Sequence, residues 1–162
     1  MCNYCGCRDF PLIARLSAEH EDIANAAGRL RTSILHGTDD RFEALDALID
    51  LLMPHTATEE NGLFRELRAE GSLTEEVDKL CAEHDDIHGV LGSIDRQDPD
   101  WAAVLAALER LTRHIDNEEH GLFPASVIVL PITAWDRVTY PTTSESPTQP
   151  ADDQQVATGA SS

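Results

Sequence analysis

The sequence predicts an all-α protein built as an up-down-up-down four-helix bundle, and three observations lead to this prediction. Four long segments place apolar residues at alternating steps of three and four, which is the spacing of one face of an α-helix. Aromatic residues make up only 5% of the chain while alanine and leucine are abundant, a composition that favours helices over strands. The third observation is an internal repeat, in which one helical hairpin is used twice.

The first two helices are expected at about residues 12–35 and at about residues 39–70, and both carry histidines among their apolar residues. Thr38 or Asp39 is the expected N-cap of the second helix, Pro54 is expected to kink it, and Gly71 is a natural stop. The core-facing stripe of the first helix is Leu16, His20, Ile23, Ala27, Leu30 and Ile34. That of the second is Leu45, Leu48, Leu52, His55, Glu59 and Leu63.

The third and fourth helices repeat this pattern. The third is expected to open at Ser72, with Glu75 in capping-box spacing, and the fourth at Asp98-Pro99. Pro124 is expected to end or bend the fourth helix. The stripe of the third helix is Val77, Leu80, His84, Ile87, Leu91 and Ile94. That of the fourth is Val104, Leu108, Leu111, His114, Glu118 and Leu122.

The chain divides into three parts around one domain, because 162 residues suit a single core. Residues 1–9 form a cysteine-rich N-terminal segment, and residues 10–138 form the bundle, whose last part is a short helix or turn around Trp135. Residues 139–162 are poor in apolar residues and rich in proline, serine, threonine and acids, so we expect a disordered acidic tail.

The charge of the chain limits its partners. A formal net charge of -18 and a pI near 4.5 argue against nucleic acid and anionic membranes, because both need a basic surface. No apolar run approaches the roughly 20 residues that span a bilayer. The N-terminus has neither the basic nor the apolar region of a secretion signal. We therefore expect a cytoplasmic protein, whose protein partner the sequence does not identify.

The repeat has two parts, and both contain ionisable residues. The letters AEHEDI at residues 18–23 recur as AEHDDI at residues 82–87, and HTATEENGLF at residues 55–64 recurs as HIDNEEHGLF at residues 114–123. In the second part, the histidine and the first glutamate differ by about 40° around the helix, so they point inward together. Glu60 and Glu119 stand at about 140° from those histidines and are expected to be solvated or to support a neighbouring ligand.

The core seams therefore contain four histidines and two glutamates: His20, His55, Glu59, His84, His114 and Glu118. A buried ionised carboxylate costs several kcal/mol unless a cation neutralises it. Imidazole and carboxylate without thiolate suit iron, and two carboxylates shared among four helices suit a pair of ions. Zinc is the alternative, although six ligands exceed its usual four.

This arrangement of one histidine, His-x-x-x-Glu, one histidine and His-x-x-x-Glu, over about residues 10–125, resembles the hemerythrin-like family, also called HHE cation-binding proteins. The opening Met-Cys-x-Tyr-Cys-Gly-Cys resembles its actinobacterial branch. The resemblance implies two non-haem iron ions joined by an oxo or hydroxo bridge. It also implies that the four histidines are terminal ligands and that Glu59 and Glu118 bridge the metals.

His88 departs from the repeat. It follows His84 by four residues, as in the His-x-x-x-His pair of oxygen-carrying hemerythrins, whereas its counterpart in the first half is Ala24. As a ligand, His88 would favour reversible oxygen binding at one iron; as a packed or surface residue, it would leave both irons an exchangeable position and favour peroxide or redox chemistry. The carriers have His-x-x-x-x-Asp in the fourth helix where this chain has His-x-x-x-Glu, which weighs against a dedicated carrier.

The cysteines allow several interpretations. Cys2, Cys5 and Cys7 could bind a metal with a fourth ligand from elsewhere, act as a redox switch, or form a reduced flexible segment. Cys81 lies beside the stripe of the third helix and is expected to be a small buried apolar residue.

Three functions follow from the resemblance and the ligand set. The favoured one is a di-iron protein that binds O2, NO or peroxide in a redox-responsive role. The second is a di-iron enzyme that decomposes peroxide or reduces NO. The third is delivery of iron or repair of damaged clusters. The sequence leaves open whether the centre is catalytic.

Overall fold

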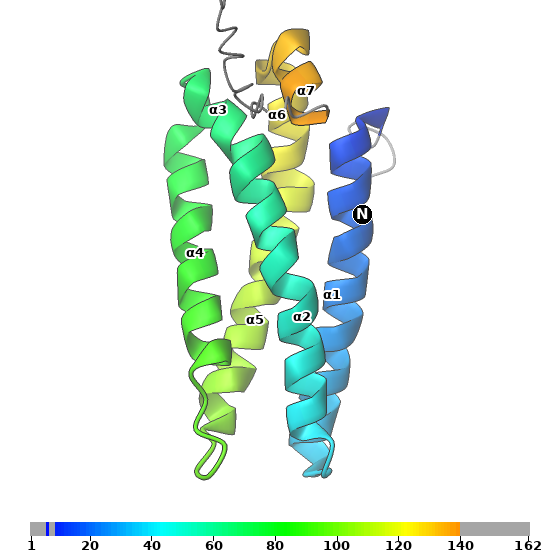
Figure 1. The fold of residues 1–162 in the computed structure, drawn as a ribbon, viewed down its shortest axis with the longest axis vertical. Coiled ribbons are helices and arrows are strands. Elements are labelled where there is room, and N and C mark those ends of the chain that lie inside the picture. The colour runs from blue at the N-terminus through cyan, green and yellow to red at the C-terminus, as the bar shows by residue number, and fades with distance from the viewer. Residues whose placement is uncertain (1–5, 7–8, 140–162) are drawn as a thin grey trace, which may run out of the picture.

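The predicted four-helix bundle is confirmed. The computed structural model describes residue 6 and residues 9–139, and its four long helices run side by side in alternating directions (Figure 1). These helices are α1 (Pro11–His36), α2 (Arg41–Glu59), α4 (Thr74–Gly92) and α5 (Trp101–Asn117). The short connections at Gly37 to Asp40 and at Ser93 to Asp100 make the helices of each hairpin antiparallel neighbours.

Two π-helical turns stand at matching places in the hairpins. The turn η2 (Glu60–Phe64) continues α2 into α3 (Arg65–Ala69), and η3 (Glu118–Leu122) continues α5 into α6 (Phe123–Val129). The second helical unit therefore ends near residue 70 as expected, with Gly71 at a φ of 65°. Pro124 lies at the start of α6, directly after the π-helical turn η3, and it does not end the helix, which continues to Val129.

Several helix starts differ from the sequence expectation. Asp40 precedes α2, so neither Thr38 nor Asp39 is its N-cap, and the side chain of Asp40 makes no capping bond. The expected capping box at Ser72 is also wrong, because Leu73 takes a left-handed conformation with a φ of 53° and α4 begins at Thr74. At α5 the N-cap is Asp100, whose carboxylate accepts a 3.0 Å hydrogen bond from the Ala103 N–H. The sequence pattern did not predict these starts, because the residue at which a helix begins depends on the conformation of the turn before it.

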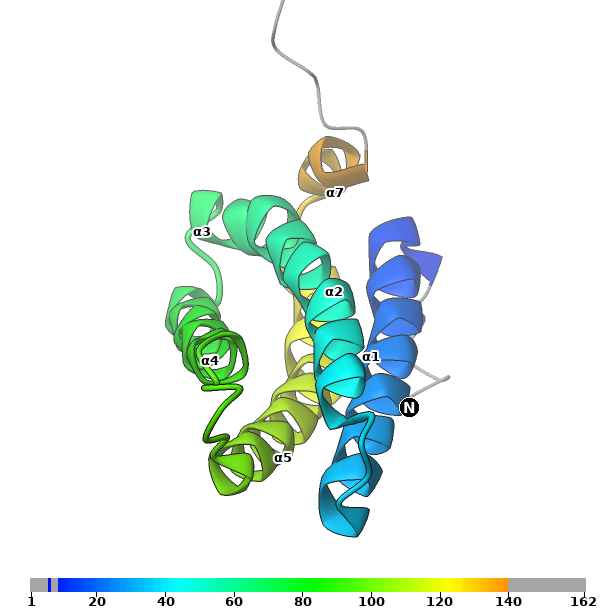
Figure 2. The same ribbon diagram turned by 60° about the horizontal axis from the view of Figure 1, so that its bottom comes forward.

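Two apolar layers divide the core along the bundle. The layer at the α3 and α6 end includes Leu16, Leu63, Phe64, Phe123 and Trp135, and α7 (Ile132–Thr139) packs beside α1 there (Figure 2). The layer at the opposite end consists of aliphatic side chains: Ile23, Leu30, Leu45, Leu48, Leu91, Val104 and Leu108 are among them. The buried histidines and glutamates lie between these layers.

Two of the features expected from the sequence, the N-terminal cysteines and the acidic tail, involve residues that the structure does not describe. Cys2, Cys5 and Cys7 and the tail from residue 140 onward lie outside the described residues, whereas Thr139 ends α7. In the described part of the chain, no helix combines the length and the apolar character needed to cross a membrane.

Candidate metal centre

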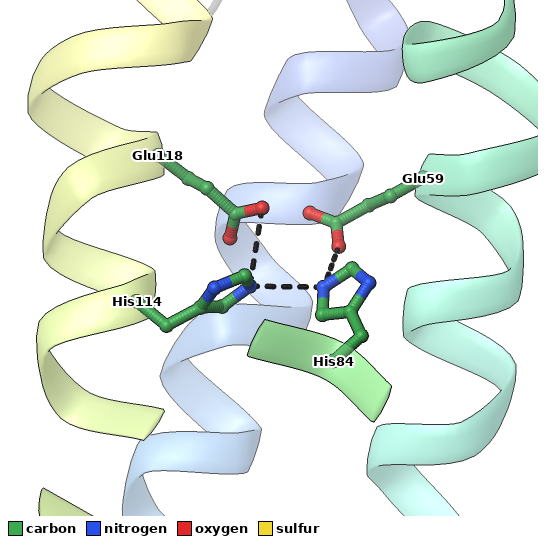
Figure 3. A group of neighbouring side chains, drawn as sticks. All are labelled: Glu59, His84, His114 and Glu118. Atoms are coloured by element: carbon green, nitrogen blue, oxygen red, sulfur yellow. Dashed lines mark hydrogen bonds and ion pairs between the residues drawn. The ribbon is translucent and has the colours of Figure 1, made fainter. Parts of the chain in front are cut away.

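The six residues predicted as metal ligands lie together in the middle of the bundle, and each is at most 4% exposed. Their ring and carboxylate atoms form two groups in which one atom of each residue lies within 4.8 Å of the others. One group is Glu59, His84, His114 and Glu118, which face one another from three helices in Figure 3, and the other is His20, His55 and Glu59. Glu59 belongs to both groups and therefore lies between two candidate cation positions.

Each glutamate faces histidines of both hairpins. Glu59 Oε1 lies 3.3 Å from His55 Nε2, while its Oε2 lies 3.4 Å from His84 Nε2. Glu118 Oε1 lies 3.3 Å from His114 Nε2, while its Oε2 lies 3.2 Å from His20 Nε2. The two carboxylates thus span the space between a histidine pair from the first hairpin and a histidine pair from the second.

The side chains at this centre fit a cation pair. In the described part of the chain, His20 Nε2 and all four oxygens of Glu59 and Glu118 are buried without an oriented hydrogen bond. Leaving so many buried polar atoms unsatisfied is costly. His84 Nε2 and His114 Nε2 also face each other at 2.9 Å, as two nitrogens directed at one ion would do. Nitrogen and carboxylate oxygen are suitable ligands for iron and for zinc.

A second carboxylate orients each of the four histidines. The Nδ1 atom of His20 lies 2.8 Å from Glu119, and that of His55 lies 3.0 Å from Glu19. The Nδ1 atom of His84 lies 2.8 Å from Glu60, and that of His114 lies 2.9 Å from Glu83. If Nδ1 donates its proton to the carboxylate, Nε2 keeps a lone pair directed at the centre. Glu60 and Glu119 were expected either to be solvated or to support a neighbouring ligand. In the structure, each supports a histidine on another helix.

The π-helical turns and two phenylalanines complete the centre, and sequence reasoning missed both. The turn η2 begins directly after Glu59, and η3 begins at Glu118. Each π-helical turn contains one residue more than an α-helical turn, which rotates the side chains that follow around the helix axis. Phe64 then stacks on His84 at 5.9 Å, and Phe123 stacks on His20 at 5.6 Å. The shared Gly-Leu-Phe ending of the repeat was the available signal for these contacts.

The metal-free centre keeps its charge balance with protons. Burial lowers the pKa of His20, but the carboxylates of Glu118, Glu119 and Glu59 outweigh burial and raise that pKa to about 11. Burial is likewise outweighed at His114, where Glu118 and Glu83 raise the pKa to about 9. Burial raises the pKa of Glu59, but the facing histidines His20, His55 and His84 hold it well below its usual value. Cations that bind here must therefore displace protons.

His88 lies outside both candidate cation groups. Its Nε2 lies 3.3 Å from the Thr56 hydroxyl oxygen, and its ring is parallel to that of His84 at a centroid distance of 6.1 Å. Of the two roles considered for His88, this arrangement corresponds to the packed residue. Cys81 packs against the apolar layer at the α3 and α6 end as expected, but it is half-buried rather than buried, and its sulfur accepts a 3.3 Å hydrogen bond from Arg68.

Comparisons with known proteins agree with this geometry. The hemerythrin HHE cation-binding domain matches residues 10–126, which is more than half of the chain and includes every residue of the centre. Searches among curated proteins and among solved structures gave no significant match. Because the family match covers α1 through most of α6, the chain belongs to the hemerythrin HHE cation-binding family.

Proposed function

We propose that this protein holds two non-haem iron ions through His20, His55, Glu59, His84, His114 and Glu118, and that the ion pair binds small oxidants such as O2, NO or peroxide in a redox-responsive role. The observation that supports this proposal is the placement of the two buried glutamates. Each directs one oxygen at a histidine of the first hairpin and the other oxygen at a histidine of the second.

The protein would supply each ion with two imidazole nitrogens and two carboxylate oxygens. Such a set leaves room for an exogenous ligand on iron, although zinc, with its usual four ligands, would already be satisfied. When bound, the iron pair supplies electrons and exchangeable ligand positions for a small oxidant. The residues of the chain orient the histidines through Nδ1 and bury the site between two apolar layers.

The packing of His88 favours redox chemistry over a dedicated oxygen carrier. Because His88 contacts Thr56 and lies outside both groups, the protein offers equal numbers of nitrogens at the two positions. Both ions would therefore keep a position for an external ligand. This equality also supports the second candidate function, a di-iron enzyme that decomposes peroxide or reduces NO.

The test is anaerobic titration of the metal-free full-length protein with ferrous iron, followed by optical spectra under O2, NO and hydrogen peroxide. We expect two irons per chain and a spectral change with at least one oxidant, whereas Glu118→Gln should lose iron. Glu109→Gln, which changes an exposed glutamate on the same helix, is the matched control and should load normally. Preferential zinc loading, or full iron loading of Glu118→Gln, would refute the proposal.

Gas evolution distinguishes the two candidate functions. Sustained oxygen release on repeated addition of hydrogen peroxide would identify a catalytic role, whereas one stoichiometric spectral change that reverses on reduction would identify binding. A third experiment measures the transfer of iron from this protein to a metal-free acceptor protein. If the rate is the same with and without an oxidant, the result indicates iron delivery and contradicts the redox-responsive role.

A further inference from the structure

The two halves of the centre match closely, yet their outer walls differ at one position. The repeat relates Ala24 on α1 to His88 on α4, because both follow the histidine of their helix by four residues. Ala24 is exposed, whereas His88 is half-buried against α2. The two halves therefore differ in the space that leads to the centre, while the kinds of side chain that face the centre are the same in both halves.

On the first side, a cavity of about 350 Å³ lies between α1 and the α5–η3 segment and reaches the ring of His20. Ser17, Glu119 and Ile115 line it together with Ala24. A smaller hollow of about 170 Å³ continues along the same groove and shares Ala24 and Ile115 with the cavity. Small side chains on α1 thus leave a path from the surface to the ring of His20.

A buried hydroxyl in this cavity is suited to a guest molecule. Ser17 is only 1% exposed, and its Oγ makes no hydrogen bond within the part of the chain that the structure describes. Its counterpart in the repeat, Cys81, accepts a hydrogen bond from Arg68. A buried polar group without a protein partner requires water or a ligand, and Ser17 lines the cavity where either would lie.

On the second side, His88 occupies the corresponding place. Its ring lies parallel to that of His84, and its Nε2 lies 3.3 Å from the hydroxyl of Thr56. Thr56 is itself the counterpart of Ile115, so a polar contact with His88 stands where the first side has the apolar side chain of Ile115. The imidazole of His88 fills the space that the methyl group of Ala24 leaves open.

We propose that small molecules reach the centre through the cavity beside Ala24, and that His88 and Thr56 close the matching path on the other side. The cavity has ample room for a molecule as small as azide or hydrogen peroxide, and the Ser17 hydroxyl would bind one that has a hydrogen-bonding atom. This inference rests on the proposed function, because it assigns the entry side of that same centre.

Xenon tests the path without any metal, since it occupies apolar cavities in crystals under pressure. We expect xenon beside Ala24 in the metal-free and iron-loaded wild-type protein. It should be absent in Ala24→Phe, and a second xenon should appear between α2 and α4 in His88→Ala. Ala47→Phe, the same change at an exposed position of α2, should leave the first xenon in place. Xenon on the His88 side of the wild-type protein would overturn the inference.

Azide binding to the iron-loaded protein tests the path in solution. We expect the association rate to fall about tenfold or more in Ala24→Phe, to stay unchanged in Ala47→Phe, and to recover in the double variant Ala24→Phe/His88→Ala, because the second path is then open. Ser17→Ala should weaken azide affinity severalfold without slowing association.

The outcomes separate the two proposals. If wild-type protein loads no iron or binds neither azide nor any small oxidant, the proposed function fails, while the xenon positions still decide the entry side. If wild-type protein binds azide and Ala24→Phe binds it as fast as Ala47→Phe does, the entry side is refuted and the proposed function stands.

Discussion

The first hairpin, α1 with α2, and the second, α4 with α5, direct the same side chains at the centre but enclose it differently. His20 and His55 meet edge to face at 4.6 Å and 62°, and His84 and His114 repeat this contact at 4.6 Å and 61°. Outside these rings, Ala24 and His88 give one hairpin a cavity and the other a packed imidazole. The parts that would hold cations are repeated, whereas the parts that would control access to them are not.

The supporting carboxylates show that neither hairpin forms the centre alone. Glu19 supports His55 and Glu83 supports His114, both within one hairpin. Glu60 and Glu119, in contrast, reach across to His84 and His20 of the other hairpin. Two of the four contacts that orient the histidines thus depend on how the hairpins pack together. Matched pairs of variants, one in each hairpin, can measure how far the two halves are equivalent.

The largest effect is expected from the two facing glutamates. Glu59→Gln and Glu118→Gln each remove a negative charge that faces both histidine pairs, so each should reduce iron from two ions per chain to less than about one. Metal analysis after desalting measures this loss. Equal losses would show that the hairpins contribute equally; retention of both ions in either variant would contradict a shared carboxylate.

A smaller loss is expected when one histidine is removed from either hairpin. His55→Ala and His114→Ala each withdraw one nitrogen from only one candidate position, so each variant should lose about one of two ions. Iron content with circular dichroism, which verifies that the bundle is intact, distinguishes this from unfolding. Complete metal loss in one variant but not the other would show that one position must fill first.

The supporting carboxylates should have weaker effects, of about 10- to 100-fold in metal affinity for each Glu→Gln change. The side chain of Glu119 is 9% exposed and that of Glu60 is 40% exposed, so Glu119→Gln should weaken affinity more than Glu60→Gln. Competition with a chelator measures both affinities. Glu19→Gln and Glu83→Gln, whose side chains are each 30% exposed, form the matched pair and should behave alike.

The metal-free protein should become less stable as the pH rises. The pKa of His20 is raised to about 11 and that of His114 to about 9, both above the ordinary value of 6.5. Their stabilising contribution is therefore complete below pH 6.5 and is lost as the pH rises toward those values. For each proton involved, the free energy of unfolding should fall by about 1.4 kcal/mol per pH unit above that point.

Urea unfolding of the metal-free protein between pH 7 and pH 10 measures this fall. His114→Gln should reduce the slope below about pH 9, and iron-loaded protein should show no such slope, because metal ions have replaced the protons. A stability that rises over this range would contradict the charge balance described for the metal-free centre.

The helices and the convergence of the six candidate ligands were predictable from local patterns. His55 and Glu59, like His114 and Glu118, stand four residues apart, and a helix turns such a pair toward one side whatever its surroundings. The expected helix starts at Ser72 and Asp98 were wrong, because Leu73 and Asp100 occupy turns whose geometry depends on the preceding loop. Local periodicity is therefore informative inside an element and weak at its ends.

The bundle and the inward-facing set of four histidines and two glutamates could be predicted from residue spacing alone, since both follow from the turn of one helix and from the cost of burying charge. The contacts between helices could not: they establish which carboxylate supports which histidine, that His88 contacts Thr56, and that a cavity lies beside Ala24. These contacts join side chains on different helices, and their geometry depends on how those helices pack and on the shift that each π-helical turn introduces.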